Sequence, residues 1–436
     1  MIAARLRRIG ALAAPTALVA LLQVFGQLFE TWLAARQGTA ALAGWATVLP
    51  FALLMQMMST GAMGGGVVSA IARALGGGRR EEASAMVLHA GLIALAAGLL
   101  FALPLAVFPR GIFGAIGGAA VAEAAAPYAM WLFGAAAVPV WMTNTLASVL
   151  RGGGRHALAA RVLVLAWLAL PPTSWALAEP FGMGLAGLGA AMALVFWVAT
   201  LAMGLVVLRG GAGFVPRLRM RPQAAIFGRI LSVGLVASGL AVVANLATIL
   251  VTAQMAAHGA VAVAAYGISA RLEFLMIPLA FGIGSALTAL VGRAAGAGDW
   301  AEARALAWTG AAMALLLTGA AGLVVALWPV QVASLFTGDA AVVAIAARGL
   351  AYVGLAFGGF GLGMALYFAS QGAGRMAYPV AGALSRLALA VGGGAVLAGP
   401  LGMGIEGHFL GVALGITAYG AVTALGVRRA VWPGGA

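Results

Sequence analysis

Residues 73–83 read RALGGGRREEA, and residues 293–303, exactly 220 positions later, read RAAGAGDWAEA. The two stretches share an arginine, two glycines and a Glu-Ala pair in one register. The same offset aligns further Pro, Gly and Arg residues: Pro109 with Pro329, Gly118 with Gly338, Gly134 with Gly354, Gly152, Gly154 and Arg155 with Gly372, Gly374 and Arg375, and Gly182, Gly184 and Gly187 with Gly402, Gly404 and Gly407. One ungapped offset that keeps several residue types in register indicates an internal duplication.

The composition places this duplication in a membrane. Of the 436 residues, 64% are hydrophobic and only 8% are charged, whereas soluble domains carry roughly 25% charged residues. A soluble globular enzyme is therefore excluded. At roughly 20 residues per membrane-spanning helix, the apolar stretches predict twelve spans: 11–36, 40–72, 83–108, 122–149, 157–179, 184–208, 230–257, 260–292, 303–328, 341–370, 376–398 and 405–427.

We therefore expect an all-α polytopic membrane protein built from two six-helix lobes. The lobes are predicted to be residues 1–209 and 230–436, joined by a basic, Pro-containing cytoplasmic linker at 210–229. Because each lobe has an even number of spans, both have the same topology in the membrane, which predicts pseudo-two-fold symmetry about its normal. Transporters built from parallel repeats bind substrate where the repeats meet and alternate access by rocking.

Arginine sets the expected orientation, because cytoplasmic loops are enriched in basic residues. All 24 basic residues are Arg. One side of the predicted membrane carries most of them: Arg5, Arg7, Arg8, Arg73, Arg79, Arg80, Arg151, Arg155, Arg161, Arg209, Arg217, Arg219, Arg221, Arg229, Arg293, Arg304, Arg375, Arg428 and Arg429. The other side carries Arg36, Arg110 and Arg348, with acidic residues Glu123, Glu179, Asp339 and Glu406 in or near its loops. We expect an inner (plasma) membrane protein with both termini in the cytoplasm.

Several function classes lack the residues they need. Cysteine is absent and the four histidines form no HExxH cluster, so no metal site, cofactor or enzyme activity is predicted. No GK[ST] phosphate-binding loop supports ATP-driven transport. The net charge of +14 is spread over loops with no soluble basic segment, so we expect no nucleic-acid partner. The expected partners are the lipid bilayer and a small amphipathic substrate, with no obligate protein partner.

A series of short motifs is similar in order, spacing and duplication to those of one transporter family. They are Pro15, Glu30-Thr31, the stretch Gly76–Ala83, Arg151-Gly-Gly-Gly-Arg155, Pro278 with Gly282-Ile-Gly284, the stretch Val291–Gly298, and Gln371-Gly-Ala-Gly-Arg375. Over essentially its whole length the sequence resembles the multidrug and toxic compound extrusion (MATE) transporters. The resemblance implies a twelve-span antiporter that exports drugs, metabolites and other organic cations against an inward H⁺ or Na⁺ gradient.

Glu30 is the leading candidate for cation coupling. Gln23, Gln27 and Glu30 follow at i, i+4 and i+7 and share one helix face, and such a polar stripe on an apolar helix is expected to face a wet cavity. An acidic residue inside a membrane span is a functional candidate by default. The resemblance carries a coupling role over to Glu30, with Gln27 and Thr31 beside it, although the family usually has Asp at this position. The alternatives are a Glu30 that snorkels to the interface or only packs.

A second candidate site lies in the second lobe at Glu273, about mid-way through its span. Arg271 is two residues away and points to another face, so Arg386 at similar depth is the better partner. The pattern leaves three interpretations open: a structural Glu273–Arg386 ion pair, a second substrate or cation site that includes Asn245, and an exposed Glu273. Gln23, Gln56, Met57, Asn144, Thr248 and Tyr367 are candidates for the substrate cavity.

The choice of coupling ion follows from the family's acidic positions. Sodium-coupled MATE branches carry further carboxylates in the spans corresponding to 230–257 and 341–370. Here the first has Asn245 and the second has no acid. One carboxylate is enough to bind a proton but supplies too few oxygen ligands to coordinate Na⁺, so H⁺ is favoured over Na⁺. The alternative function is a lipid-linked precursor flippase of a related fold, which predicts extra spans and a strongly basic cavity.

Overall fold

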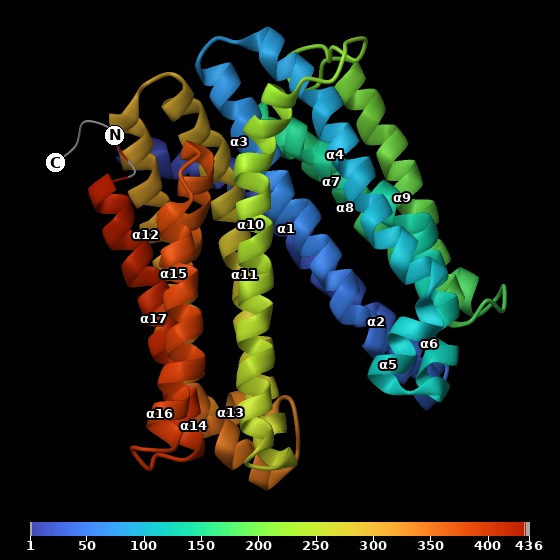
Figure 1. Ribbon diagram of the computed structural model, residues 1–436, viewed down its shortest axis with the longest axis vertical. Helices are drawn as coiled ribbons and strands as arrows, with labels where there is room; N and C mark the ends of the chain where they lie inside the picture. Colours follow the sequence, from blue (N-terminus) through green and yellow to red (C-terminus); the bar gives the residue numbers. More distant parts are fainter. Residues whose placement is uncertain (1, 431, 433–436) are drawn as a thin grey trace. The chain divides into compact units, whose positions relative to one another are not determined.

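A computed structural model describes residues 2–430 and 432, and this part of the chain contains helices and no strands (Figure 1). The helices are α1 (Ile2–Arg36), α2 (Thr39–Met57), α3 (Met63–Gly76), α4 (Arg80–Val107), α5 (Pro109–Gly117), α6 (Ala119–Trp131), α7 (Ala137–Gly152), α8 (His156–Ala178), α9 (Leu185–Leu208), α10 (Ala224–Ala256), α11 (Ala260–Gly296), α12 (Trp300–Leu327), α13 (Pro329–Ser334), α14 (Ala340–Ala373), α15 (Ala377–Leu387), α16 (Gly394–Ala398) and α17 (Ile405–Ala430). Three π-helical turns continue their neighbours: η1 (Met58–Ala62), η2 (Leu132–Ala136) and η3 (Ala388–Gly393).

Twelve segments of the described chain are long and apolar enough to cross a membrane, which confirms the predicted span count and the all-α class. Most ends agree within a few residues. Two spans begin earlier than predicted: the first at Ile2 instead of residue 11, and the seventh at Ala224 instead of residue 230. The seventh starts just after Pro222, where a proline can precede a helix without losing a helical hydrogen bond. Ala224 therefore lies inside the stretch predicted as the linker.

The chain folds as two compact units. Unit 1 comprises residues up to 13 together with 236–436, and unit 2 comprises residues 14–235. Unit 2 buries large side chains such as Phe133, Trp141 and Phe196, and unit 1 buries Phe357 and Phe409. Both α1 and α10 are divided between the units. The predicted lobes, 1–209 and 230–436, describe the sequence repeat, and their boundaries stay a prediction.

The backbone shows the duplication directly. Four pairs of glycines 220 positions apart have nearly equal positive φ: Gly78 and Gly298 (75° and 77°), Gly154 and Gly374 (79° and 74°), Gly182 and Gly402 (67° and 68°), and Gly184 and Gly404 (57° and 57°). Only glycine adopts such φ values at low cost. The short helices α5 and α13 also begin at paired prolines, Pro109 and Pro329, where the fixed φ of proline suits a first helical position. The two repeats therefore share their turns as well as their spans.

A repeated ion cluster joins the start of each repeat's first helix to the first turn of a helix in the other repeat. In unit 1, Glu302 in the first turn of α12 accepts from Arg5 Nε and Nη2 (2.9 and 2.8 Å) and from Arg8 Nη1 (2.9 Å). In unit 2, Glu82 in the first turn of α4 accepts from Arg229 near the start of α10. Glu82 and Glu302 are the glutamates that the 220-residue offset aligns. The first turns of α1, which begin earlier than predicted, are thus held by Glu302, a residue far away in the sequence.

We expect Glu302→Gln to lower the free energy of unfolding by about 1 kcal/mol, because it weakens several charge-assisted hydrogen bonds at a partly exposed site. The measurement is thermal or denaturant unfolding of the purified protein in detergent. Glu81→Gln is the matched control, since the Glu81 side chain is 90% exposed and its Arg217 partner lies 3.7 Å away. An equal loss of unfolding free energy in the two variants would contradict a stabilising role for the Glu302 ion cluster.

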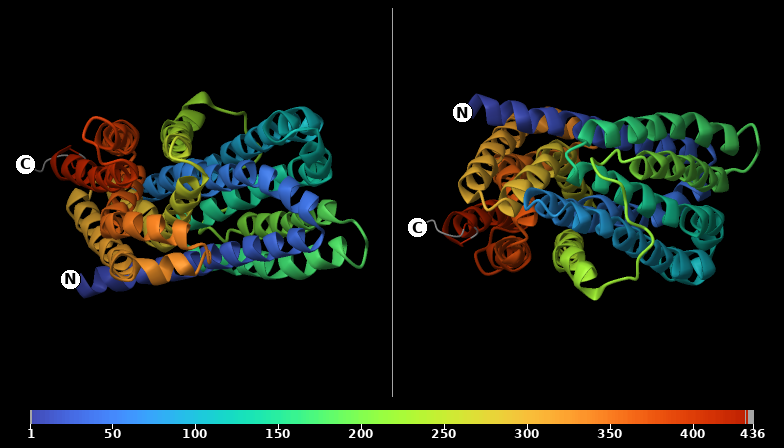
Figure 2. Two further views of the ribbon diagram at one scale, coloured as in Figure 1. Left: turned by 90° about the horizontal axis from the view of Figure 1, so that it is seen from below. Right: turned by 90° about the horizontal axis from the view of Figure 1, so that it is seen from above.

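The connection between α9 and α10 lies along one end of unit 2 (Figure 2). Ser84 on α4 donates to the Val215 carbonyl (2.6 Å), and the Arg217 amide donates to the Ser84 carbonyl (3.2 Å). The Gln223 amide donates to His89 Nε2 (2.8 Å) just before α10 begins. These bonds fix the basic connection against α4.

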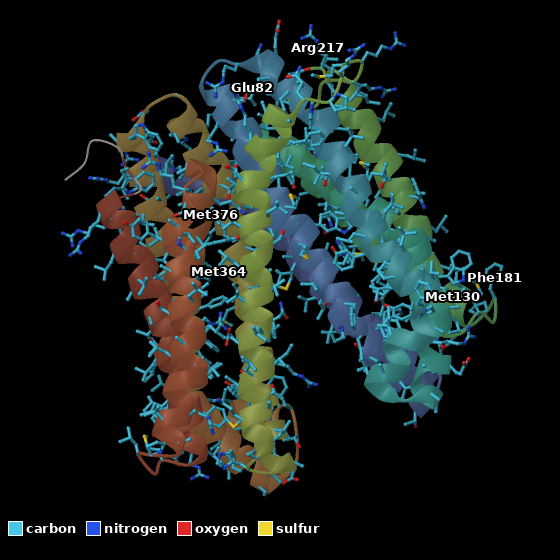
Figure 3. The ribbon with its side chains drawn as sticks, viewed as in Figure 1. Glu82, Met130, Phe181, Arg217, Met364 and Met376 are labelled. Carbon is cyan, nitrogen blue, oxygen red and sulfur yellow. The ribbon has the colours of Figure 1, made fainter. Side chains whose placement is uncertain are left out.

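Residues predicted on opposite membrane sides lie at opposite ends of unit 2. Figure 3 places Glu82 and Arg217 at one end, with Met130 and Phe181 toward the other. The three arginines predicted on the outer side each pair with an acidic residue predicted on that side: Arg36 with Glu179 (2.7 Å), Arg110 with Glu123 (2.7 Å) and Arg348 with Glu406 (2.9 Å). The hydrogen bond from Arg36 holds the pKa of Glu179 below its usual value. The arginines predicted on the outer side are thus largely neutralised by these partners, which increases the charge difference between the two predicted sides.

Candidate functional site

Glu30 lies near the end of α1, and its carboxyl is buried in unit 2. Its side chain is only 5% exposed, and Oε1 has no hydrogen-bond partner. No ion pair within residues 2–430 and 432 includes it. A buried carboxylate without a partner is costly, so this carboxyl is stable when it holds a proton or has a cation beside it. Glu30 does not snorkel to the surface.

The other members of the predicted stripe are less buried than Glu30. Gln23 and Gln27 are half-buried on α1. The Thr31 hydroxyl donates to the Gln27 carbonyl one turn earlier (2.8 Å), so its proton is committed to its own helix. The structure therefore shows these side chains on the same helix as Glu30 but no hydrogen bond from them to its carboxyl.

Sequence reasoning missed Tyr128, an aromatic side chain that lies close to Glu30. Tyr128 on α6 is buried and close enough to interact electrostatically with the carboxyl. Trp45 on α2 is also buried in the core of unit 2 and lies within hydrogen-bonding reach of Tyr128. Gly44 lets α2 approach α6 closely, since a Cβ there would lie 2.8 Å from the Ala125 nitrogen. Close packing of α2 on α6 thus accompanies a buried Tyr128 near Glu30, with Trp45 beside Tyr128.

Two substrate-cavity candidates turn out to be partners of each other. Asn144 Nδ2 on α7 donates to Gln56 Oε1 (3.1 Å) and to Ser59 Oγ (2.9 Å), and all three side chains are buried. Ser59 belongs to η1, and π-helical turns occur frequently at functional sites. Met57 beside this network is half-buried, whereas Met55 is part of the core. Gln56 and Asn144 help to hold η1 against α7. The spacing of these residues along the chain does not predict this role.

The Glu273–Arg386 contact expected from depth is present in unit 1. Arg386 Nη2 donates to Glu273 Oε1, and the two side chains are 13% and 15% exposed. The Arg386 guanidinium also lies over the Phe360 ring, 5.8 Å from its centroid. Arg271 is exposed and points elsewhere, as expected for a residue two positions from Glu273. The pair joins α11 to α15 and leaves neither charge isolated.

Of the remaining second-lobe candidates, only Thr248 is linked to this pair. Thr248 on α10 lies within hydrogen-bonding reach of Tyr266, which interacts electrostatically with Glu273. Asn245, one turn earlier, donates to the Ala241 carbonyl of its own helix (2.8 Å). Tyr367 on α14 is buried and accepts from Gln371 Nε2 (3.4 Å). The structure therefore associates Thr248 with Glu273 through Tyr266 and shows no such contact for Asn245 or Tyr367.

The described residues contain no group of three or more His, Cys, Asp or Glu side chains arranged to hold a metal ion. The candidate site in unit 2 is thus one buried carboxyl near a buried tyrosine, and the candidate site in unit 1 is one buried ion pair.

Comparisons with known proteins match the whole length of the chain. The sequence model of the MatE family matches residues 15–175 and 221–395. The fold is similar to that of a MOP superfamily transporter from Pyrococcus furiosus, described as having a binding pocket of reverse polarity that suggests a different function. The identity is 22%, the TM-score is 0.91, and 97% of this chain and 95% of that chain are covered.

Two further solved structures have the same fold. A MATE protein in complex with MaD3S is 24% identical with a TM-score of 0.89, and an outward-facing multidrug resistance MATE transporter of the MOP superfamily is 22% identical with a TM-score of 0.89. Each comparison covers 97% of this chain and 95% of the other. No curated protein sequence matches the chain.

Proposed function

Because the chain belongs to the MatE family of membrane transporters, we propose that it is a secondary active antiporter that exports amphipathic, cationic organic compounds in exchange for H⁺. The family membership and the twelve apolar helices make it a multi-pass membrane transporter. The coupling ion, the substrate class and the direction of transport are our proposal. The observation that carries it is the buried, unpartnered carboxyl of Glu30.

The proposed cycle uses the charge of Glu30. The ionised carboxylate attracts a cationic substrate in a low-dielectric environment, where charge interactions are strong. Protonation removes that charge, weakens the hold on the substrate and lets α1 repack. Because the substrate and the proton compete for one group, the inward proton gradient drives export. The duplicated six-span unit supports a rocker-switch alternation of access, in which one repeat moves against the other.

Proton coupling is preferred to Na⁺ coupling because oxygen ligands are few. Hard cations such as Na⁺ are held by several oxygen ligands at once, as hard divalent cations are. At Glu30 the structure shows one carboxyl with the Tyr128 phenol near it, whereas the Thr31 hydroxyl already donates within α1. A proton needs only the carboxyl.

A lipid-linked precursor flippase remains the alternative, and the ion pair in unit 1 weighs against it. A flippase of this kind needs free cationic side chains for phosphate groups. Arg386 is paired with Glu273 and so does not present a free charge. We also propose an inner-membrane location with both termini cytoplasmic, because the basic residues Arg79, Arg217 and Arg229 gather on one side.

Reconstituted protein tests the proposal. We expect an imposed proton gradient to drive uptake or release of a fluorescent lipophilic cation in proteoliposomes, and an equal Na⁺ gradient at constant pH to drive little. Liposomes without protein give the background. If only the Na⁺ gradient drives transport, the coupling ion is Na⁺ and not H⁺. Transport of a lipid-linked phosphate without transport of the organic cation would favour the flippase.

A further inference from the structure

Two histidines meet at one end of unit 1, away from the sites described above. His258 lies in the turn after α10, and His408 lies in the first turn of α17. Their ring centroids are 5.3 Å apart with an angle of 69° between the rings. His258 is exposed, whereas His408 is 5% exposed and its Nδ1 has no hydrogen-bond partner. The pair therefore combines a solvent-accessible imidazole with a buried one that has an unused ring nitrogen.

A second unpartnered polar atom borders the same place. Gln254, one turn before His258, donates through Nε2 to the Val391 carbonyl (3.1 Å), while its buried Oε1 has no partner. Three residues after Val391, Gly394 faces His408, since a Cβ built there would lie 3.5 Å from Nδ1. A buried amide oxygen that accepts no hydrogen bond is unfavourable, and a bound cation would relieve this. Gln254 and His408 thus offer two electron-pair donors beside residues 391–394.

The ring separation suits two imidazoles on one metal ion. A Zn–N bond of about 2.0–2.1 Å puts the ion about 3.2 Å from each ring centroid, and a tetrahedral angle then separates the centroids by about 5.2 Å. The observed separation is 5.3 Å. Imidazole nitrogen is a preferred ligand for Zn²⁺, Cu²⁺ and Ni²⁺. Edge-to-face stacking of two rings without an ion gives a similar separation and is the alternative that the titration below distinguishes.

We propose that His258 and His408 form a binding site for Zn²⁺ at the predicted outer end of α10 and α17. Gln254 Oε1 and water complete the ligands. The site belongs to the second repeat alone, because the positions 220 residues earlier are Gly38 and Leu188. A bound ion ties the end of α10 to the start of α17. The proposal is independent of the transported compound and of the coupling ion.

Zn²⁺ titration of the purified full-length protein in detergent tests the site. We expect saturable binding by calorimetry and a rise in unfolding temperature that Mg²⁺ does not produce. His258→Ala and His408→Ala are expected to weaken binding by about 10-fold or more, as loss of a ligand does. His258 is exposed, so its replacement leaves the fold intact. Glu406→Gln is the matched control, because Glu406 is a nearby carboxylate already paired with Arg348.

Two results would overturn the assignment. Zn²⁺ affinity unchanged in both histidine variants would place any bound ion elsewhere. If the wild-type protein shows no saturable Zn²⁺ binding, the contact between His258 and His408 is ring stacking alone.

Discussion

Glu30→Gln is expected to abolish gradient-driven efflux, reducing transport in proteoliposomes to the level of liposomes without protein. The amide keeps the size of the side chain but neither ionises nor takes up a proton, so substrate and proton no longer compete for one group. The buried position of the carboxyl, without a hydrogen-bond partner at Oε1, makes this the substitution with the largest expected effect on coupling.

Stability separates this loss from misfolding. An uncharged amide is easier to bury than an unpaired carboxyl, so Glu30→Gln is expected to unfold at the same temperature as wild type or above it. Glu30→Asp retains a titrating group and is expected to retain part of the coupled transport. Glu123→Gln makes the same change at an exposed carboxyl of unit 2 that pairs with Arg110, and it is the control for a general disturbance. Wild-type efflux by the Glu30→Gln variant would remove the coupling assignment.

The spans could be predicted closely because each is a long apolar run between glycines and arginines. The turns could be predicted because the repeat aligned glycines such as Gly184 and Gly404, which then proved to have equal φ. The helix starts near Arg5 and Arg229 were missed. Their partners, Glu302 and Glu82, lie far away in the sequence, and apolar periodicity carries no information about such contacts.

The candidate residues illustrate the same limit. Sequence reasoning identified Glu30 as polar in an apolar helix but had no signal for Tyr128 or Trp45, whose aromatic character is common in membrane spans. It selected Gln56 and Asn144 separately, and their hydrogen bond across 88 positions emerges only when η1 packs on α7. The π-helical turns had no sequence signal, because their residues are the same small and apolar types as those of the helices they interrupt.

The second large effect is expected at the Glu273–Arg386 pair. Arg386→Met leaves the Glu273 carboxylate buried without its partner, which is expected to lower the free energy of unfolding by about 3–5 kcal/mol. Glu273→Gln strands the guanidinium and is expected to destabilise by a similar amount, relieved in part by the stacking of Arg386 on Phe360. The double variant removes both charges and is expected to lose much less than the sum of the two single losses. Denaturant unfolding in detergent measures the three differences.

Transport by the double variant decides between the two interpretations of the pair. If Glu273 and Arg386 only join α11 to α15, the folded double variant exports the lipophilic cation at the wild-type rate, because both helices keep their apolar packing. If the pair binds substrate or a cation, the double variant is stable but transports poorly, and the loss persists after correction for the amount of folded protein. We expect the first outcome, since the two charges neutralise each other while Glu30 in unit 2 has no ionic partner. A stable double variant without transport would instead make unit 1 a second site of the transport cycle.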